Sequence, residues 1–321
     1  MVLSKWVIAD LTIIVFWIGV WVLYICGMTL DMAESVINGV ELLISNREGM
    51  GIPHVLSVSG GKTSTYMALH YPADYYIFSL IRIDAKYCRP KDDGIVRYVS
   101  DKIGFDFVAT AESDKVLYVM RELEQRLGKE VVWVTGDSFD EVVRKRKMIP
   151  NMVARFCTTD MKIEPIFKYC HNVIGSVVNM GIGFRFDELE RANSQNTHFK
   201  TIVGKSSGGR NKWAEVYWRE LYFPLIEDKI THYPVYQWSL GSGFDFTFDS
   251  NCVGCFWKPV QQLRKNWDDE PLKMRWFSEL EQKYRRTFKK GVKYENIKKM
   301  GLQSDFNFGT GAGCQAGFCI D

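Results

Sequence analysis

The sequence lacks a strong excess of charge of either sign. Its 321 residues include 41 lysines and arginines against 38 aspartates and glutamates, a net charge of +3. This balance excludes an argument for nucleic-acid binding from overall charge alone. Small anionic ligands are still allowed, because they need only local positive charge. With 46% hydrophobic residues, the chain is an ordinary globular sequence, long enough for one large domain or two smaller ones.

The sequence also lacks the cysteine density of a disulfide scaffold, and it has no internal repeat or extended low-complexity tract. Eight cysteines are spread over 321 residues. Cys252 and Cys255 form a C-x-x-C, and Cys314 and Cys319 lie at the C-terminal end. In a reducing compartment, such spacing indicates metal or redox chemistry more readily than structural bridges.

Charge is absent altogether from residues 11–30, LTIIVFWIGVWVLYICGMTL. As a helix these residues span about 30 Å, the thickness of the hydrocarbon core of a bilayer. We therefore expect 1–50 to be a hydrophobic N-terminal helical segment with a transmembrane anchor at 11–30. A buried or oligomerising helix is the alternative, and it would make the protein a homo-oligomer. A misassigned start codon, with Met32 or Met50 as the internal start, is the third.

After residue 50 the apolar pattern alternates between strand and helix. Strands are expected at 54–59, 75–83, 107–110, 131–135 and 177–184, with helices at 63–70, 92–103, 114–127 and 139–147. This alternation predicts an α/β domain over 51–238 with a parallel sheet flanked by helices. The polar, Gly/Ser-rich segment 192–214 is predicted to be a loop or lid. Residues 239–321 form an irregular, cysteine-containing C-terminal region with a helix at 271–286.

The stretch HVLSVSGGKTSTYMAL, residues 54–69, ends a predicted strand and begins a helix with Gly61-Lys62-Thr63. A Walker A loop also needs a glycine five residues before Gly61. That position is Leu56, inside the strand, so the Walker A interpretation fails. The glycines that remain form a short loop at the carboxyl end of a strand. Such a loop lets backbone N–H groups approach an anion at a helix N-terminus.

This loop resembles the PP-loop, SGGxxS, of the adenine nucleotide α-hydrolase-like superfamily, which includes ATP pyrophosphatases and phosphoadenosine phosphosulfate (PAPS) reductases. Three later blocks strengthen the resemblance: RFCTTDMKIEPI at 155–166, GIGFRFDELERA at 181–192 and FPLIEDKITHYPVYQW at 223–238. They occur in the order of the PAPS reductase family, and the resemblance covers 55–258. It implies that an adenine nucleotide, ATP or PAPS, binds with Mg²⁺ at these residues: Ser57, Ser59, Gly60, Gly61, Lys62, Thr63, Ser64 and Arg191.

The same resemblance implies catalytic roles for Lys62, Arg185, Asp187 and Glu188. Lys62 and Arg185 supply positive charge at strand ends, and the guanidinium fork suits phosphate or sulfate. The two carboxylates would orient Arg185 or ligate Mg²⁺. The alternative to a phosphate site is that these residues are only the solvent-exposed start of a helix, with Asp187 and Arg191 paired at i,i+4.

The C-x-x-C suits a zinc ion, an iron–sulfur cluster or a redox dithiol. In the resembling adenylyl-sulfate reductases, a Cys-Cys pair and a later C-x-x-C hold a [4Fe-4S] cluster. Cys157 matches the first cysteine of the pair, Thr158 replaces the second, and Cys252 and Cys255 match the later pair. Our hypothesis is that Cys314 or Cys319 supplies the fourth thiolate. Zn²⁺ in place of the cluster is the second possibility, and thiols without a metal are the third.

The resemblance implies an ATP pyrophosphatase that adenylates an unknown acceptor, a nucleic acid among the candidates, for sulfur transfer. The alternative is a PAPS or adenylyl-sulfate reductase that uses a thiol reductant. The tail GCQAGFCID, however, lacks the histidine that follows the nucleophilic cysteine of PAPS reductases. A third hypothesis is a membrane-tethered nucleotide sensor without turnover. An ATP-dependent domain after an anchor has to face the cytoplasm. Local basic patches for a nucleic acid would be 144–147 or 283–290, although both also suit solvated helix faces.

Overall fold

The computed structural model describes residues 51–206, 208–248 and 251–302. The described residues from Ile52 onward belong to one compact unit. Several predictions lie outside the described residues: the anchor at 11–30, the helical pattern at 31–50, and the roles of Cys314 and Cys319. Within the described part, no helix is long and apolar enough to cross a membrane.

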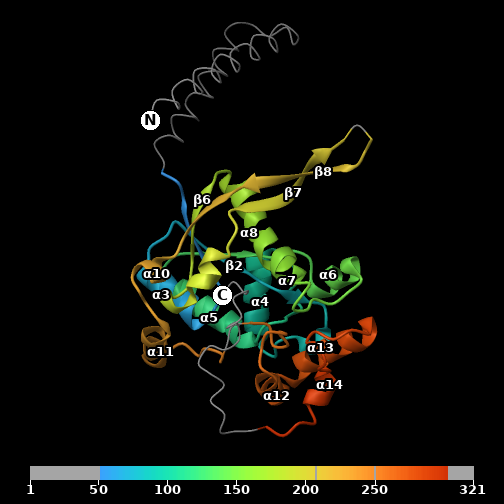
Figure 1. Ribbon diagram of the computed structural model, residues 1–321. Helices are drawn as coiled ribbons and strands as arrows, with labels where there is room; N and C mark the ends of the chain where they lie inside the picture. Colours follow the sequence, from blue (N-terminus) through green and yellow to red (C-terminus); the bar gives the residue numbers. More distant parts are fainter. Residues whose placement is uncertain (1–50, 207, 249–250, 303–321) are drawn as a thin grey trace, which may run out of the picture. The chain divides into compact units, whose positions relative to one another are not determined.

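A five-stranded sheet lies at the centre of the unit, with the strand order β5-β2-β1-β6-β9 (Figure 1). Each neighbouring pair of strands is parallel. The α/β architecture predicted from the alternating pattern, a parallel sheet flanked by helices, is therefore confirmed. The strands are β1 (His54–Val58), β2 (Tyr75–Ser79), β5 (Val131–Val134), β6 (Val178–Ile182) and β9 (Arg219–Tyr222).

Helices cover both faces of the sheet. Successive residues of each strand point to opposite sides, so each strand contributes side chains to the core on either face. On β1, Leu56 and Val58 belong to one core and Val55 to another. The first core is closed by α3 (Lys62–His70), α4 (Asp93–Ile103) and α5 (Asp114–Leu127). The second is closed by an irregular helical stretch that runs through α7 (Phe156–Thr158), η2 (Thr159–Ile163), α8 (Glu164–Tyr169) and η3 (Cys170–Ile174).

Beyond the sheet, a third core joins the C-terminal helices to two short strands and the helix that follows β5. The predicted helix at 271–286 is confirmed as α13 (Pro271–Tyr284). The other elements of this layer are β3 (Arg82–Ile83), η1 (Lys86–Cys88), β4 (Ala109–Thr110), α6 (Phe139–Arg146), α12 (Val260–Asp269) and α14 (Tyr294–Ile297).

The single strand predicted at 75–83 is in fact two. β2 ends at Ser79, and the chain leaves the parallel sheet to form β3, which pairs antiparallel with β4. All of 77–83 except Ser79 and Arg82 is apolar. A continuous apolar run shows that the segment is buried but not where it changes sheet.

The loop or lid predicted at 192–214 is also largely wrong. The chain passes through η4 (Phe186–Glu188) and α9 (Leu189–Asn193) and then forms the antiparallel hairpin of β7 (His198–Lys205) and β8 (Asn211–Tyr217). Cross-strand pairs of bulky residues, such as Phe199 with Val216, overrule the polar composition. Only the Gly/Ser-rich residues between the two strands keep the character of a loop. The block 223–238 forms α10 (Pro224–Glu227) and most of α11 (His232–Gly241).

Candidate functional site

The loop between β1 and α3 is shaped by one glycine and two serines. Gly60 has φ +70°, and a Cβ there would lie 2.8 Å from Val116 Cγ1, so this position requires glycine. Ser64 Oγ accepts a hydrogen bond from Ser59 N at 3.1 Å and donates one to Gly61 O at 3.2 Å. The hydroxyl groups of Ser59 and Ser64 are 3.0 Å apart. These bonds fix the loop at the start of α3, where the helix dipole favours an anion.

The predicted loop residues are placed in two ways. Ser57 lies inside β1, buried, opposite Ile77 and Ile182 of the neighbouring strands. The other six continue from the end of the strand into the first turn of the helix. They are Ser59, Gly60, Gly61, Lys62, Thr63 and Ser64.

The turn after β6 lies beside the loop, because β6 is the neighbour of β1 in the sheet. The chain leaves β1 towards β2 on one side and returns to β6 on the other, so this is the topological switch point where parallel sheets bind ligands. A Cβ on Gly183 would be only 3.4 Å from Ser64 Cα. Two residues later, Arg185 Nη1 donates a hydrogen bond to Thr63 Oγ1 at 2.9 Å.

Two carboxylates and a second arginine surround Arg185. Glu188 Oε2 lies 3.1 Å from Arg185 Nη2, and Glu188 Oε1 also pairs with Arg191. Asp187 Oδ1 is 3.4 Å from Arg185 Nε, and its side chain is 43% exposed. Arg191 is buried, with its guanidinium 4.7 Å from the centre of the Phe184 ring. Arg191 therefore pairs with Glu188 and not with Asp187, the partner expected if these residues were only a solvent-exposed helix start.

Lys62 adds positive charge at this switch point, and His232 lies beside these cations. Lys62 Nζ donates a hydrogen bond to Phe248 O at 3.2 Å and lies 5.9 Å from the centre of the Phe248 ring. Burial lowers the pKa of His232, the nearby charges of Arg185 and Lys62 lower it further, and Asp187 opposes them. The sequence analysis missed the roles of His232 and Phe248. His232 lies within the quoted block 223–238, but nothing in its spacing indicates its place beside Arg185.

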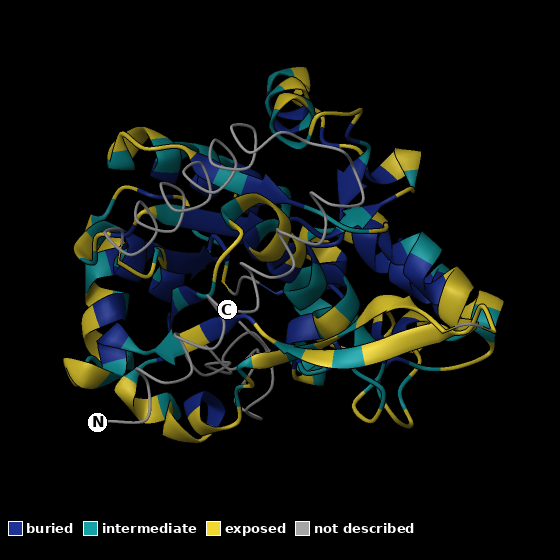
Figure 2. Cartoon of the chain, turned by 90° about the horizontal axis from the view of Figure 1, so that it is seen from above, coloured by how far each residue is buried: buried dark blue, intermediate teal, exposed yellow. Residues whose placement is uncertain are grey.

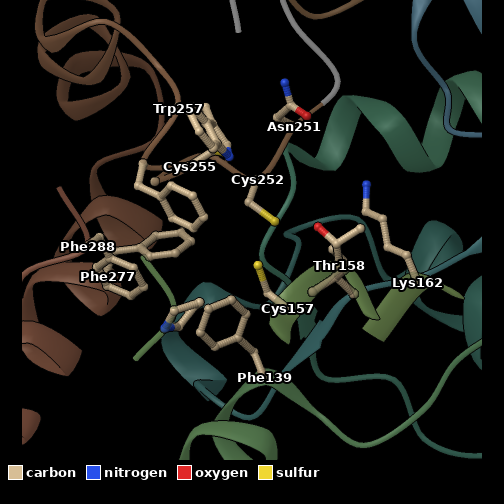
Figure 3. A pocket seen from close by; sticks show the side chains of 14 residues that line it. Phe139, Cys157, Thr158, Lys162, Asn251, Cys252, Cys255, Trp257, Phe277 and Phe288 are labelled. Carbon is tan, nitrogen blue, oxygen red and sulfur yellow. The ribbon is translucent and has the colours of Figure 1, made fainter. Parts of the chain in front are cut away.

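A second site gathers three of the predicted metal-ligating cysteines in one pocket. Cys157 of α7 faces Cys252 and Cys255, which lie in the loop before α12 (Figure 3). In the close-up the sulfur atoms of Cys157 and Cys252 point toward one another. Thr158, which stands where the resembling reductases have a cysteine, lines the same pocket. Aromatic rings form much of its wall, those of Phe139, Phe256, Trp257, Phe277 and Phe288.

The loop that carries Cys252 and Cys255 is fixed by its neighbours. Val253 N donates to Ala111 O at 2.8 Å, and the Tyr294 hydroxyl donates to Gly254 O at 3.0 Å. A Cβ on Gly254 would lie 2.4 Å from the Phe277 ring, so only glycine fits there. The two thiols are thus held at set positions by tertiary contacts.

The thiols lie in an environment that disfavours free thiolates. Burial raises the pKa of Cys157 to about 12, and the neighbouring Cys255 contributes. Burial also raises the pKa of Cys252 well above its ordinary value, and Glu112 adds to this rise while Lys162 opposes it. Deprotonation of such thiols requires a cation or a metal centre between them.

A buried ion pair adjoins the cysteine pocket and was missed at the sequence level. Glu112, 1% exposed, lies 3.2 Å from Lys162 Nζ. Burial raises the pKa of Glu112, while Lys162, Lys273 and Lys258 lower it. Glu112 follows the strand at Ala109–Thr110, a position where a sequence search of strand ends could have found it.

Three cysteines from two segments line one pocket, and cysteine thiolates are the ligands of iron–sulfur clusters. The types of residue present therefore suit such a metal centre. In the described part of the chain, no group of three or more His, Cys, Asp or Glu side chains is arranged to hold one metal ion. Cys88 and Cys170 are buried and do not line this pocket; Cys88 belongs to the core against which Cys157 and Cys252 pack, and Cys170 to a core on the sheet.

Comparisons with known proteins add little to this geometry. No protein-family profile and no curated protein matches the chain. Among solved structures, the chain is similar to the U34-tRNA thiolase NcsA from Methanococcus maripaludis with its [4Fe-4S] cluster. The identity is 18% over 80% of this chain and 76% of that one, with a TM-score of 0.33.

Proposed function

We propose that the chain is a PP-loop enzyme that binds ATP with Mg²⁺ and adenylates an acceptor for sulfur transfer. In the adenylation step, an oxygen of the acceptor attacks the α-phosphorus of ATP. The bond between the α-phosphorus and the bridging oxygen breaks, and pyrophosphate leaves. The loop from Ser59 to Ser64 would hold that pyrophosphate through backbone N–H groups, which are stabilising because they are already oriented.

The observation that carries this proposal is the hydrogen bond of Arg185 to Thr63 at the switch point. It brings a guanidinium from the turn after β6 to the first turn of the helix that follows the phosphate loop. A guanidinium group can donate two parallel hydrogen bonds to two oxygens of one phosphate. Lys62 adds a second cation, so the site can balance the charge that develops on the leaving pyrophosphate.

The two acidic residues, Asp187 and Glu188, have different proposed roles. Glu188 is held between Arg185 and Arg191, which suits a positioning role. Asp187 is the more exposed carboxylate and is the one available to bind Mg²⁺ together with phosphate oxygens. Arg191, buried against Phe184, would act through Glu188 and would not touch the nucleotide.

The cysteine pocket would hold a [4Fe-4S] cluster through Cys157, Cys252 and Cys255, with zinc as the alternative metal. A bound cluster would supply the chemistry that handles sulfur, which a nucleotide site alone does not offer. The aromatic walls would exclude water from the centre. The fourth ligand proposed from the sequence, Cys314 or Cys319, lies outside the described residues.

A second candidate is a thiol-dependent PAPS or adenylyl-sulfate reductase. It is favoured by the same cysteine pocket, because Cys157, Cys252 and Cys255 are the residues that match the cluster ligands of the resembling reductases. In that enzyme the loop would bind the sulfate end of the nucleotide, and an external thiol would release sulfite.

The experiment follows γ-labelled ATP with Mg²⁺ and the full-length protein, supplied with a cell extract as the source of acceptor. Release of labelled pyrophosphate, without labelled phosphate, supports the proposal. The variant Lys62→Ala should abolish the release, whereas Arg275→Ala, on the exposed face of α13, should leave it unchanged. Labelled phosphate from the wild type would indicate ordinary ATP hydrolysis and contradict the proposal. Sulfite release from PAPS would support the reductase.

A further inference from the structure

The hairpin of β7 and β8 carries positive charge that neither the nucleotide site nor the cysteine pocket uses. Within residues 198–217 there are four cations, Lys200, Lys205, Arg210 and Lys212, against the single carboxylate of Glu215. All four cations are exposed. None of them is ion-paired within the described part of the chain.

The hairpin is anchored at its base and exposed beyond it. The Phe199 ring stacks on Phe167 of α8 with 4.6 Å between centroids, and Val216, opposite Phe199, packs into the same core. Beyond this anchor nearly every residue is exposed, as Figure 2 shows by the yellow ribbon. The paired strands therefore present their side chains on a fixed scaffold.

Exposed apolar side chains lie among the cations. Trp213 is 55% exposed and lies opposite Ile202, which is 46% exposed. Tyr217, 43% exposed, lies four residues further along the same strand. By the register of the hairpin, Lys200 lies on the same face as Ile202 and Trp213. An indole and a lysine on one face offer a stacking surface together with a charge, a combination that binds the bases and phosphates of single strands.

The helix patch at 144–147 is a poorer match for a polyanion, because acids neutralise it. Arg144 pairs with Glu141, Lys145 with Asp137 and Arg146 with Asp160. The hairpin, in contrast, joins unpaired cations to an exposed aromatic ring. In a chain with a net charge of only +3, this local excess beside an exposed ring complements a polyanion, and the second basic segment, 283–290, is compared with it in the test.

We propose that the β7–β8 hairpin binds nucleic acid with unpaired bases, its cations contacting phosphates while Trp213 stacks on a base. This names the class of acceptor. It rests on the proposed function for the chemistry that follows binding, but the binding itself needs neither ATP nor a metal.

The test is fluorescence anisotropy of a labelled 20-nucleotide single-stranded RNA with the full-length protein, without ATP, across a salt series. The hairpin variant replaces Lys200, Lys205, Arg210 and Lys212 with alanine. The matched control replaces four other exposed cations: Lys283, Arg286, Lys290 and Lys293. The hairpin variant should bind at least tenfold more weakly. Its slope of log affinity against log salt should be less steep by about 3, for four lost phosphate contacts. The control should stay within about twofold of the wild type.

A second pair of variants tests the stacking. Trp213→Ala should weaken binding by roughly tenfold, and Trp213→Phe should restore most of the loss, because a ring is kept. Duplex RNA should bind more weakly than single-stranded RNA. Single-stranded DNA of the same length shows whether the ribose 2′-hydroxyl contributes to the affinity. Equal loss in the hairpin variant and the control would overturn the proposal, as would no binding by the wild type.

Two further readouts separate this proposal from its rivals. If the hairpin variant instead changes the oligomeric state in light scattering, with RNA binding unaltered, the hairpin is a protein interface and the proposal is wrong. Lys62→Ala should keep wild-type RNA affinity. Failure of the nucleotide site and failure of the hairpin proposal are thus observed independently.

Discussion

Arg185 Nη1 and Thr63 Oγ1 lie 2.9 Å apart, which joins the turn after β6 to the first turn of α3. Neither residue is near the other in sequence. Their contact depends on β1 and β6 being neighbours in the sheet, with Gly183 allowing close approach to Ser64. The contact joins two strand ends, and these are the ends at which we propose that the anion binds.

Loss of the Arg185 guanidinium should weaken ATP binding strongly. Arg185→Ala is expected to reduce affinity by about 10- to 100-fold, since hydrogen bonds to a charged group contribute about 1.5–3 kcal/mol. Arg185→Lys should recover only part of this, because an ammonium cannot form the paired fork. Calorimetric titration of ATP with Mg²⁺ measures both, with Arg275→Ala as the control. Wild-type affinity in Arg185→Ala would remove this residue from the site.

Gly60 and Gly104 form a matched pair of glycines. Both have positive φ, +70° and +79°, but a Cβ at Gly60 would meet Val116 whereas one at Gly104 meets nothing within 4 Å. Gly104→Ala should therefore cost only about 1 kcal/mol of unfolding free energy, from the backbone conformation. Gly60→Ala should cost about 2–4 kcal/mol, since strain and collision add. Urea unfolding measures the two costs.

The glycine pair also separates binding from stability. Gly60→Ala should lose ATP binding because the loop must shift, while Gly104→Ala should keep it. Equal ATP affinity in the two folded variants would show that the loop at Ser59–Ser64 does not hold the phosphates.

The protonation of His232 should report on the anion site. Burial and the charges of Arg185 and Lys62 lower its pKa, which favours the neutral imidazole. A bound phosphate adds negative charge beside it and should raise that pKa. Because the complex then takes up a proton, ATP affinity should increase as the pH falls through the raised pKa. Histidine NMR titrations with and without ATP measure the shift, and His232→Gln assigns the signal. An unchanged pKa in saturating ATP would contradict the placement of the phosphates.

The three cysteines of the pocket should determine the metal content. After anaerobic purification, the wild type is expected to contain iron and acid-labile sulfide, and Cys157→Ser, Cys252→Ser and Cys255→Ser should each lose most of both. Cys88→Ser and Cys170→Ser are controls, because those thiols are buried but do not line the pocket. Zinc in place of iron would support the alternative metal. Full metal content in all three pocket variants would refute the assignment.

The fold was largely predictable from the sequence, because apolar periodicity reports on burial. The runs at 54–59 and 131–135 predicted β1 and β5 to within about a residue. The helices at 92–103 and 114–127 were equally clear, since Asp92 and Ser113 cap their first turns. The pattern failed at 192–214, where pairing across the hairpin, a nonlocal effect, decides the structure.

The site was predictable in its parts but not in its assembly. The loop glycines and the C-x-x-C each carry a local signal. The approach of Cys157 to Cys252 depends on packing between segments almost a hundred residues apart, and the partners of Glu188 depend on the turn after β6. His232 carries no local signal, because it acquires its role only from the charges that the fold brings beside it. Glu112 carries only the weak signal of its place after a strand, and its lysine partner comes from another segment.

The measurement that tests the central claim most directly is calorimetric titration of the anaerobically purified full-length protein, with ATP plus Mg²⁺ and separately with PAPS. The account predicts saturable ATP binding that is lost in Lys62→Ala, together with a much weaker response to PAPS. Binding of PAPS in preference to ATP would replace the adenylating enzyme with the reductase. Binding of neither nucleotide would contradict the phosphate site itself.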